Sequence, residues 1–369
     1  MKRGWLGFED RLGPEQVVHL WHEALGLEAV VVVDNTACGV AVGGVRMAPD
    51  VTLEECFRLA RAMTFKNAAA GLRHGGGKAV IRADPAMPPA EKERLVRGFA
   101  RAIRDLASYV PGPDMGTDEV AMAWIRDEIG RAVGLPREIG GIPLDEIGAT
   151  GLGLAVACEV ACRHAGIPLA GARVAIQGFG AVGRHAARHL AERGCRIVAV
   201  SDSRGTIANE AGVDVPALLA HKAAGRPVAS FSGGRAEPAE AIVAVPCEIW
   251  IPAARPDVVH EGNVDRLQAR IVVSGANIPI TAAAEAALHA RGVLQVPDFI
   301  ANAGGVICAA VEFAGGSERA ALETIVEKIR ANTEAVLARA REDGVAPRAA
   351  AEALARERVL RAMRLRRFG

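Results

Sequence analysis

Two lysines beside a run of three glycines are the residues of this chain best suited to chemistry. Lys66 and Lys78 flank Gly75, Gly76 and Gly77 in an otherwise small and apolar stretch. Only six of the 44 lysine and arginine residues are lysines, so arginine is the ordinary cation of this chain. A desolvated lysine can lose its proton, whereas arginine stays charged. The pair therefore indicates a small anionic ligand and proton transfer, and the alternative is two surface lysines around a flexible loop.

Asp114 is a further candidate, because prolines bracket the turn that presents it. By itself it could equally be an ordinary Asx turn or helix N-cap. His74 beside the glycine run could act as an acid or base, but the sequence offers it no partner, so a packing or loop role is favoured. Two further pairs have helical spacing, His19 with His22 and His185 with His189. Since neither pair has a third ligand signal, no metal site is predicted.

A dinucleotide motif follows in the second half of the chain. Gly178-Phe179-Gly180-Ala181-Val182-Gly183 has the G-x-G-x-x-G spacing between a predicted strand and a predicted helix. The glycines allow backbone amides to approach a pyrophosphate at the positive end of the helix. Asp202 ends the next predicted strand and can accept hydrogen bonds from ribose hydroxyls, which favours NAD. Ser203 and Arg204 could hold a 2′-phosphate instead, so NADP stays open.

The elements of the first half place the lysines. We expect a helix over residues 13–26, strands at 29–33 and 40–46, and a helix that starts from the capping box at 52–55. The apolar stripe of that helix runs on to Lys66 or Asn67, which places this lysine where the buried face should be. A short strand should begin at Lys78, and a helix is expected over residues 88–106.

The second half alternates strands and helices, which predicts a parallel, doubly wound α/β sheet. Residues 140–145 form a connection, and the last part of the chain, from about residue 316, is expected to be helical. The expected strands are residues 173–177, 196–200, 248–251 and 270–273, with helices at 150–164 and 181–193.

Composition narrows the class of protein. The 369 residues are half hydrophobic and a quarter charged with a formal net charge of +1, which suits a two-domain enzyme rather than a nucleic-acid-binding protein. No segment approaches the ~18 apolar residues of a membrane span. The seven cysteines lack C-x-x-C spacing, so free thiols and a cytoplasmic location are expected.

In the order of its motifs the chain resembles the glutamate/leucine/phenylalanine/valine dehydrogenase superfamily along nearly its whole length. The matching stretches begin at Val42, Met63, Gly75, Gly112, Ala149, Gln177, Val200, Ile251, Gly275 and Val296. The resemblance implies an α/β substrate and oligomerisation domain (1–145), a Rossmann NAD-binding domain (146–340) across an active-site cleft, and a C-terminal helix (341–369) packing toward the first domain. It also implies a homo-oligomer, hexameric or octameric. From the composition, neither nucleic acid nor a membrane is an expected partner.

The activity implied by the resemblance is reversible oxidative deamination of an L-amino acid to a 2-oxo acid and ammonia, with NAD as cofactor. Lys66 would hold the substrate α-carboxylate. Lys78, with a lowered pKa, would activate water, and Asp114 would move protons to and from the amino group. The matching positions that would contact the nicotinamide are Thr150, Asn277 and Asn302.

The positions that choose the substrate point to an apolar side chain. Glutamate-type members carry a lysine before the Gly-Gly-x-Arg motif and a serine in the helix after Asn-Ala-Gly-Gly, where this chain has Val42 and Ala309. An unpaired buried carboxylate costs several kcal/mol, so a branched-chain substrate such as leucine or valine is predicted. Gly43, Gly112 and Val306 complete the implied site.

Other readings stay open. The small side chains of this site leave room for phenylalanine, and the nucleotide-binding half looks more like the glutamate-type members. Glutamate dehydrogenase itself and a catalytically silent regulatory subunit are therefore the alternatives.

Overall fold

A computed structural model of the protein describes residues 6–366, and the chain forms two compact units. Unit 1 contains the chain up to Pro143, Val306–Ala321 and the segment from Glu352 onward, and unit 2 contains Leu144–Gly305 and Leu322–Ala351. The expected domains ended at residues 145 and 340. The chain instead returns to unit 1 at Val306, because the helix there packs on the unit 1 core.

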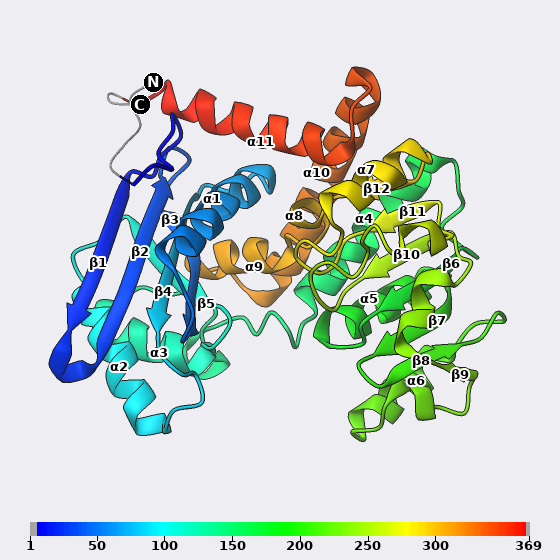
Figure 1. The fold of residues 1–369 in the computed structure, drawn as a ribbon, viewed down its shortest axis with the longest axis horizontal. Coiled ribbons are helices and arrows are strands. Elements are labelled where there is room, and N and C mark those ends of the chain that lie inside the picture. Colours follow the sequence, from blue (N-terminus) through cyan, green and yellow to red (C-terminus); the bar gives the residue numbers. More distant parts are fainter. Residues whose placement is uncertain (1–5, 367–369) are drawn as a thin grey trace. The chain divides into compact units, whose positions relative to one another are not determined.

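Unit 1 is built on a five-stranded mixed sheet of order β1-β2-β4-β3-β5 (Figure 1). β1, β2 and β4 pair antiparallel, while β3 runs parallel to both β4 and β5. The strands are β1 (Gln16–His22), β2 (Leu27–Asn35), β3 (Ala41–Ala48), β4 (Gly75–Arg82) and β5 (Tyr109–Pro113).

Helices cover both faces of this sheet. On one face, side chains of α2 and α3 such as Phe99 and Met122 pack with Val31 in a large apolar core. On the other face, α1 packs Cys56 and Ala60 against the sheet. The helices with residues in unit 1 are α1 (Leu53–Ala69), α2 (Pro89–Ala102), α3 (Glu119–Ile129), α9 (Gly304–Phe313), α10 (Glu318–Asp343) and α11 (Pro347–Met363).

Two sequence-based expectations for unit 1 are wrong. Residues 13–26 do not form a helix: β1 and a 3-10 turn, Glu23–Leu25, occupy this stretch, because β1 pairs along its full length with β2. The glycine run is not a loop but the start of β4. A Cβ atom at Gly76 would lie only 2.0 Å from the backbone nitrogen of Thr64, so the glycine allows α1 to pack directly on the strand.

Unit 2 is the predicted doubly wound α/β domain. Its seven-stranded sheet has the order β12-β11-β10-β6-β7-β8-β9, parallel from β12 to β7 with β8 and β9 antiparallel at one edge. The strands are β6 (Arg173–Gln177), β7 (Arg196–Asp202), β8 (Gly205–Ala208), β9 (Arg235–Glu237), β10 (Ile249–Pro252), β11 (Ile271–Val273) and β12 (Leu294–Val296). Its helices include α4 (Ala149–Ala165), α5 (Ala181–Glu192), α6 (Val215–Ala223), α7 (Ala282–Ala290) and α8 (Asp298–Ala301).

No helix within residues 6–366 is both long enough and apolar enough to cross a lipid bilayer.

Candidate active site

The two residues predicted to be catalytic lie together on the unit 1 sheet. Lys78 is in the middle of β4, and Asp114 directly follows β5. Since β3 alone separates these two strands, the Lys78 ammonium reaches across it and forms an ion pair with the Asp114 carboxylate. The lysine is only 5 % exposed.

Burial and neighbouring cations favour the uncharged form of Lys78, whereas the paired Asp114 carboxylate favours its ammonium form. Burial lowers the pKa of Lys78 to about 7, and the positive charges of Arg46 and Lys66 act in the same direction. Arg46, on β3, lies 3.5 Å from the Asp114 carboxylate and 2.6 Å from that of Glu55 on α1. A lysine poised near neutral pH next to a carboxylate is suited to general acid–base catalysis.

Gly44, for which the sequence suggested no role, makes room for this pair. A Cβ atom at Gly44 would lie 2.7 Å from Asp114 Cβ and 3.1 Å from Lys78 Nζ. Gly43 serves the sheet instead, because a Cβ atom there would lie 1.7 Å from the carbonyl oxygen of Gly77 on β4. The two adjacent glycines thus allow close strand packing and a compact ion pair.

Lys66 lies in the last turn of α1, and the end of that helix is tied to the sheet by its neighbour. The buried Asn67 side chain donates hydrogen bonds to the carbonyl oxygens of Gly75, at 2.7 Å, and Val42, at 3.4 Å. Asn67 therefore fixes α1 relative to both β3 and β4. Its role could not be read from the sequence, where only its place on the apolar stripe was visible.

The residues predicted to surround the substrate side chain also gather in unit 1. Val42, Val110 and Val133 form a buried apolar cluster against which Ala309 of α9 packs. A Cβ atom at Gly112 would lie 3.1 Å from a methyl group of Val133. Val306 lies one turn before Ala309 on the same helix.

The dinucleotide motif of unit 2 has the geometry that its spacing predicts. Gly178 directly follows β6 with a φ of 98°, and Gly180 is the N-cap of α5, whose first residues are Ala181 and Val182. A Cβ atom at Gly183 would lie 1.9 Å from the carbonyl oxygen of Gly178. A cavity of about 720 Å³ opens beside the motif, and its lining includes Gly178, Phe179, Gly180, Asp202, Ser203 and Lys222.

Asp202 has a partner that the sequence did not reveal. Its carboxylate accepts a hydrogen bond from the Lys222 ammonium at 2.5 Å, and from the backbone N–H groups of Arg204 and Val228 at 2.9 and 3.1 Å. Although burial opposes it, these interactions lower the pKa of Asp202. Lys222 offsets the negative charge of Asp202, the charge that would repel a 2′-phosphate.

The predicted nicotinamide contacts fit an amide ligand. Asn302 donates to Asn277 Oδ1 at 2.9 Å and to the Gly275 carbonyl at 3.3 Å, while its own buried Oδ1 has no hydrogen-bond partner. Such an acceptor suits the N–H group of a carboxamide. Thr150, at the start of α4, is close by: a Cβ atom at Gly305 would lie 3.7 Å from its hydroxyl oxygen.

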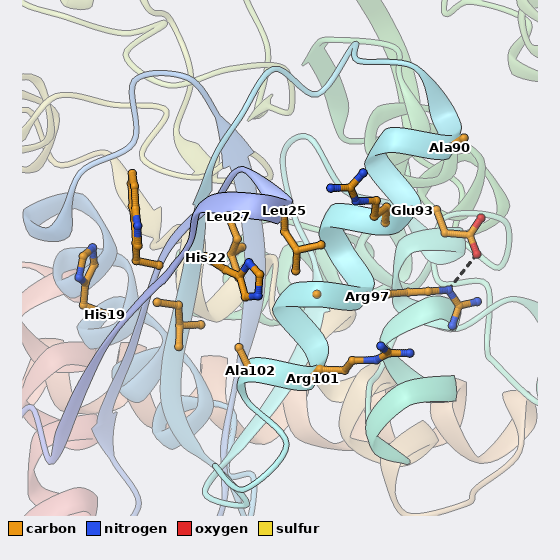
Figure 2. Close-up of a pocket in the computed structure, with 13 residues that line it drawn as sticks. His19, His22, Leu25, Leu27, Ala90, Glu93, Arg97, Arg101 and Ala102 are labelled. Carbon is orange, nitrogen blue, oxygen red and sulfur yellow. Dashed lines mark hydrogen bonds and ion pairs between the residues drawn. The ribbon is translucent and has the colours of Figure 1, made fainter.

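The two histidine pairs lie on different elements, His185 and His189 on α5 and the other pair on β1. His19 and His22 lie on β1 rather than on a helix, and line a groove between β1 and α2 with Arg97 and Arg101 (Figure 2). Throughout the described part of the chain, no group of three or more His, Cys, Asp or Glu residues is placed to hold a metal ion.

Comparison with known proteins gives matches over both units. The family model Glutamate/Leucine/Phenylalanine/Valine dehydrogenase matches residues 140–367, and its dimerisation domain matches residues 14–131. Glutamate dehydrogenase of Aeropyrum pernix is 40% identical over 90% of this chain and 85% of its own length. The NADP(+)-dependent glutamate dehydrogenase of Pyrobaculum calidifontis is 37% identical over 90% of this chain and 85% of its own.

A solved structure agrees. Hetero-hexameric glutamate dehydrogenase of Thermus thermophilus, in a Leu bound form, has a TM-score of 0.83 at 33% identity, covering 95% of this chain and 90% of that one.

These relatives contradict the branched-chain substrate predicted from Val42 and Ala309, because they are named glutamate dehydrogenases. The inference gave two pocket positions more weight than the rest of the chain. The similarity of the nucleotide-binding half to glutamate-type members agrees with the relatives instead.

The superfamily, the two-domain α/β fold and the use of NAD or NADP, by contrast, are confirmed. The chain belongs to the Glutamate/Leucine/Phenylalanine/Valine dehydrogenase family of NAD(P)-dependent amino acid dehydrogenases.

Proposed function

We propose that this protein catalyses the reversible NAD(P)-dependent oxidative deamination of L-glutamate to 2-oxoglutarate and ammonia. The observation that supports the chemistry is the buried ion pair of Lys78, with a pKa of about 7, and Asp114. Glutamate as the substrate is supported by the 40% identity to a glutamate dehydrogenase over 90% of the chain.

Each residue of the unit 1 site has a distinct task in this reaction. Lys66 binds the substrate α-carboxylate. Asp114 takes protons from and returns them to the substrate amino group. Lys78, in its uncharged form, removes a proton from the water that attacks the iminium carbon, and as an ammonium it polarises the carbonyl in the reverse direction. Bound NAD(P)⁺ supplies the hydride acceptor.

The unit 2 residues bind and orient the cofactor. The glycine motif and the first turn of α5 hold the pyrophosphate. Asp202 with Lys222 receives the adenosine ribose, and Asn302 with Asn277 orients the carboxamide, so that one face of the nicotinamide is presented.

The decisive experiment follows NAD(P)H formation from L-glutamate, with Lys78→Met as a matched control. We expect the wild type to turn over glutamate and to release one ammonium ion for each NAD(P)H formed. The variant should show no turnover. Absence of turnover by the purified wild-type chain with glutamate and either cofactor would refute the proposal and revive the silent regulatory subunit.

We also propose that the protein is a homo-oligomer, either a hexamer or an octamer. β1 is an edge strand whose outer backbone groups have no strand partner within residues 6–366, and Trp21 on it is 67 % exposed. Exposed strand edges are ready sites for association, and β1 lies within the match to the family's dimerisation domain. Light scattering of the purified chain tests the assembly: a mass of about one chain would contradict it.

The compartment is a related proposal. All seven cysteines are free, and six of them are buried. Free thiols are typical of a reducing compartment, so we infer a cytoplasmic enzyme, which cell fractionation would test.

A further inference from the structure

A glutamate substrate has a second carboxylate, and the cluster around Val42 offers it no charged partner. Val42, Val110, Val133 and Ala309 are all apolar. A carboxylate buried against them without a hydrogen-bond donor would bind poorly. The donor must come from another residue near this cluster.

His74 is placed to be that donor. It directly precedes β4, whose first residues pair in parallel with β3 so that Gly76 lies opposite Val42. Because side chains alternate along a strand, Gly76 and Lys78 share the face that carries Val42, and His74 lies two positions before Gly76 at the entrance to the strand.

Helix α9 supplies independent support for this position. The His74 imidazole meets the ring of Phe313 edge-on, with ring centroids 5.7 Å apart. Phe313 lies one turn after Ala309, and residues four apart occupy the same side of a helix. The imidazole therefore lies beside the helix face that packs against Val42.

The hydrogen bonding of His74 is incomplete. The residue is only 8 % exposed, and its buried Nδ1 has no hydrogen-bond partner. Burial lowers the pKa of His74, and this is opposed in part by a hydrogen bond from the ring to the Val40 carbonyl. A carboxylate bound beside the unpartnered Nδ1 would favour the doubly protonated ring, which has a second N–H group to donate. Leaving a buried polar atom unpaired costs free energy, as expected of a group kept for a ligand.

We propose that His74 is the specificity residue that donates a hydrogen bond to the distal carboxylate of glutamate and 2-oxoglutarate. The inference rests on the proposed function and names the side-chain contact that function requires. It assigns to His74 the task that neither Val42 nor Ala309 can perform in this chain.

The test measures reductive amination of 2-oxoglutarate and of 4-methyl-2-oxopentanoate by wild type, His74→Leu and His74→Gln. Leucine removes the donor at similar size, and glutamine retains one. For His74→Leu we expect kcat/KM with 2-oxoglutarate to fall roughly 10- to 100-fold, the loss of one charge-assisted hydrogen bond, with most of the change in KM. Its kcat/KM with 4-methyl-2-oxopentanoate should be unchanged or higher, and His74→Gln should recover part of the activity with 2-oxoglutarate.

The possible failures are distinguishable. If the wild type does not turn over 2-oxoglutarate, the proposed function itself is wrong. If it does, and His74→Leu retains full kcat/KM with 2-oxoglutarate, only the role of His74 is wrong. An equal fall for both substrates with a lower Tm would show that His74 merely supports the fold, which also overturns the inference.

Discussion

Replacing Lys78 with arginine should abolish turnover although the positive charge is kept. With a pKa of about 7, about nine-tenths of the Lys78 side chains would be uncharged at pH 8. Arginine, with a pKa of at least ~12.5, would be uncharged in fewer than ~1 in 10,000 molecules. If the free base activates water, kcat for deamination should therefore fall by at least ~10,000-fold.

The assay is NAD(P)H formation from L-glutamate at pH 8, with NAD(P)H binding followed separately by fluorescence. Binding should be unchanged, because the dinucleotide motif belongs to unit 2. Since a guanidinium is also larger than an ammonium, Lys78→Met serves as a second variant without the steric problem. Activity within ~100-fold of wild type in the arginine variant would mean that the site needs only a charge, which refutes proton transfer by Lys78.

The pKa of Lys78 also determines the pH dependence of the wild type. The pKa of Lys78 is lowered from 10.5 to about 7, and deamination needs the uncharged form. Hence kcat/KM for glutamate should rise about tenfold per pH unit below pH 7 and level off above it. A rise that continues to pH 10 would show that Lys78 titrates as an ordinary lysine.

Three further substitutions test separate parts of the structure. Gly44→Ala introduces a Cβ atom between Lys78 and Asp114 and should lower kcat by about 100-fold. Circular dichroism should show that the fold is intact. An unchanged kcat would show that the pair tolerates displacement. Lys222→Met leaves the Asp202 charge unneutralised, so the kcat/KM ratio of NADPH to NADH should fall ~10-fold or more, whereas a constant ratio would remove Lys222 from cofactor choice. Arg358→Ala removes two hydrogen bonds from α11, of 2.8 Å to the Ala68 carbonyl and 2.7 Å to the Leu72 carbonyl. Their loss should lower the free energy of unfolding, measured by urea titration, by about 1–3 kcal/mol. A change below ~0.5 kcal/mol would contradict this expectation.

Much of unit 2 could be predicted from local sequence patterns. A strand, a glycine motif and a helix follow one another within a few residues there, and the acidic residue at the end of the next strand completes the signal. Even so, the ion pair of Asp202 with Lys222 joins residues 20 positions apart on different elements, and no local pattern announces it.

Unit 1 was harder to predict because its contacts are long-range. β1 looked helical, since Pro14 and Gly26 bracket a stretch without clear strand alternation, and only pairing with β2 makes it a strand. The meeting of Lys78 with Asp114 depends on the strand order β4-β3-β5, which the sequence does not display. The role of Gly44 likewise becomes visible only when the strand order brings it next to Lys78 and Asp114.

Substrate choice was the clearest failure. Two positions that lack a charged side chain suggested an apolar substrate, although a carboxylate partner can come from another element of the same pocket. His74 is such a residue, and its neighbourhood is defined by the packing of α9 rather than by sequence spacing.

The central claim is that this protein interconverts glutamate and 2-oxoglutarate, and the most direct test is a ratio of specificity constants. With saturating ammonia and NAD(P)H, kcat/KM should be measured for 2-oxoglutarate and for 4-methyl-2-oxopentanoate on the same preparation. We predict a ratio well above ten in favour of 2-oxoglutarate, about the discrimination supplied by one charge-assisted hydrogen bond. A ratio below one would contradict the account and show that the apolar cluster around Val42 chooses the substrate after all.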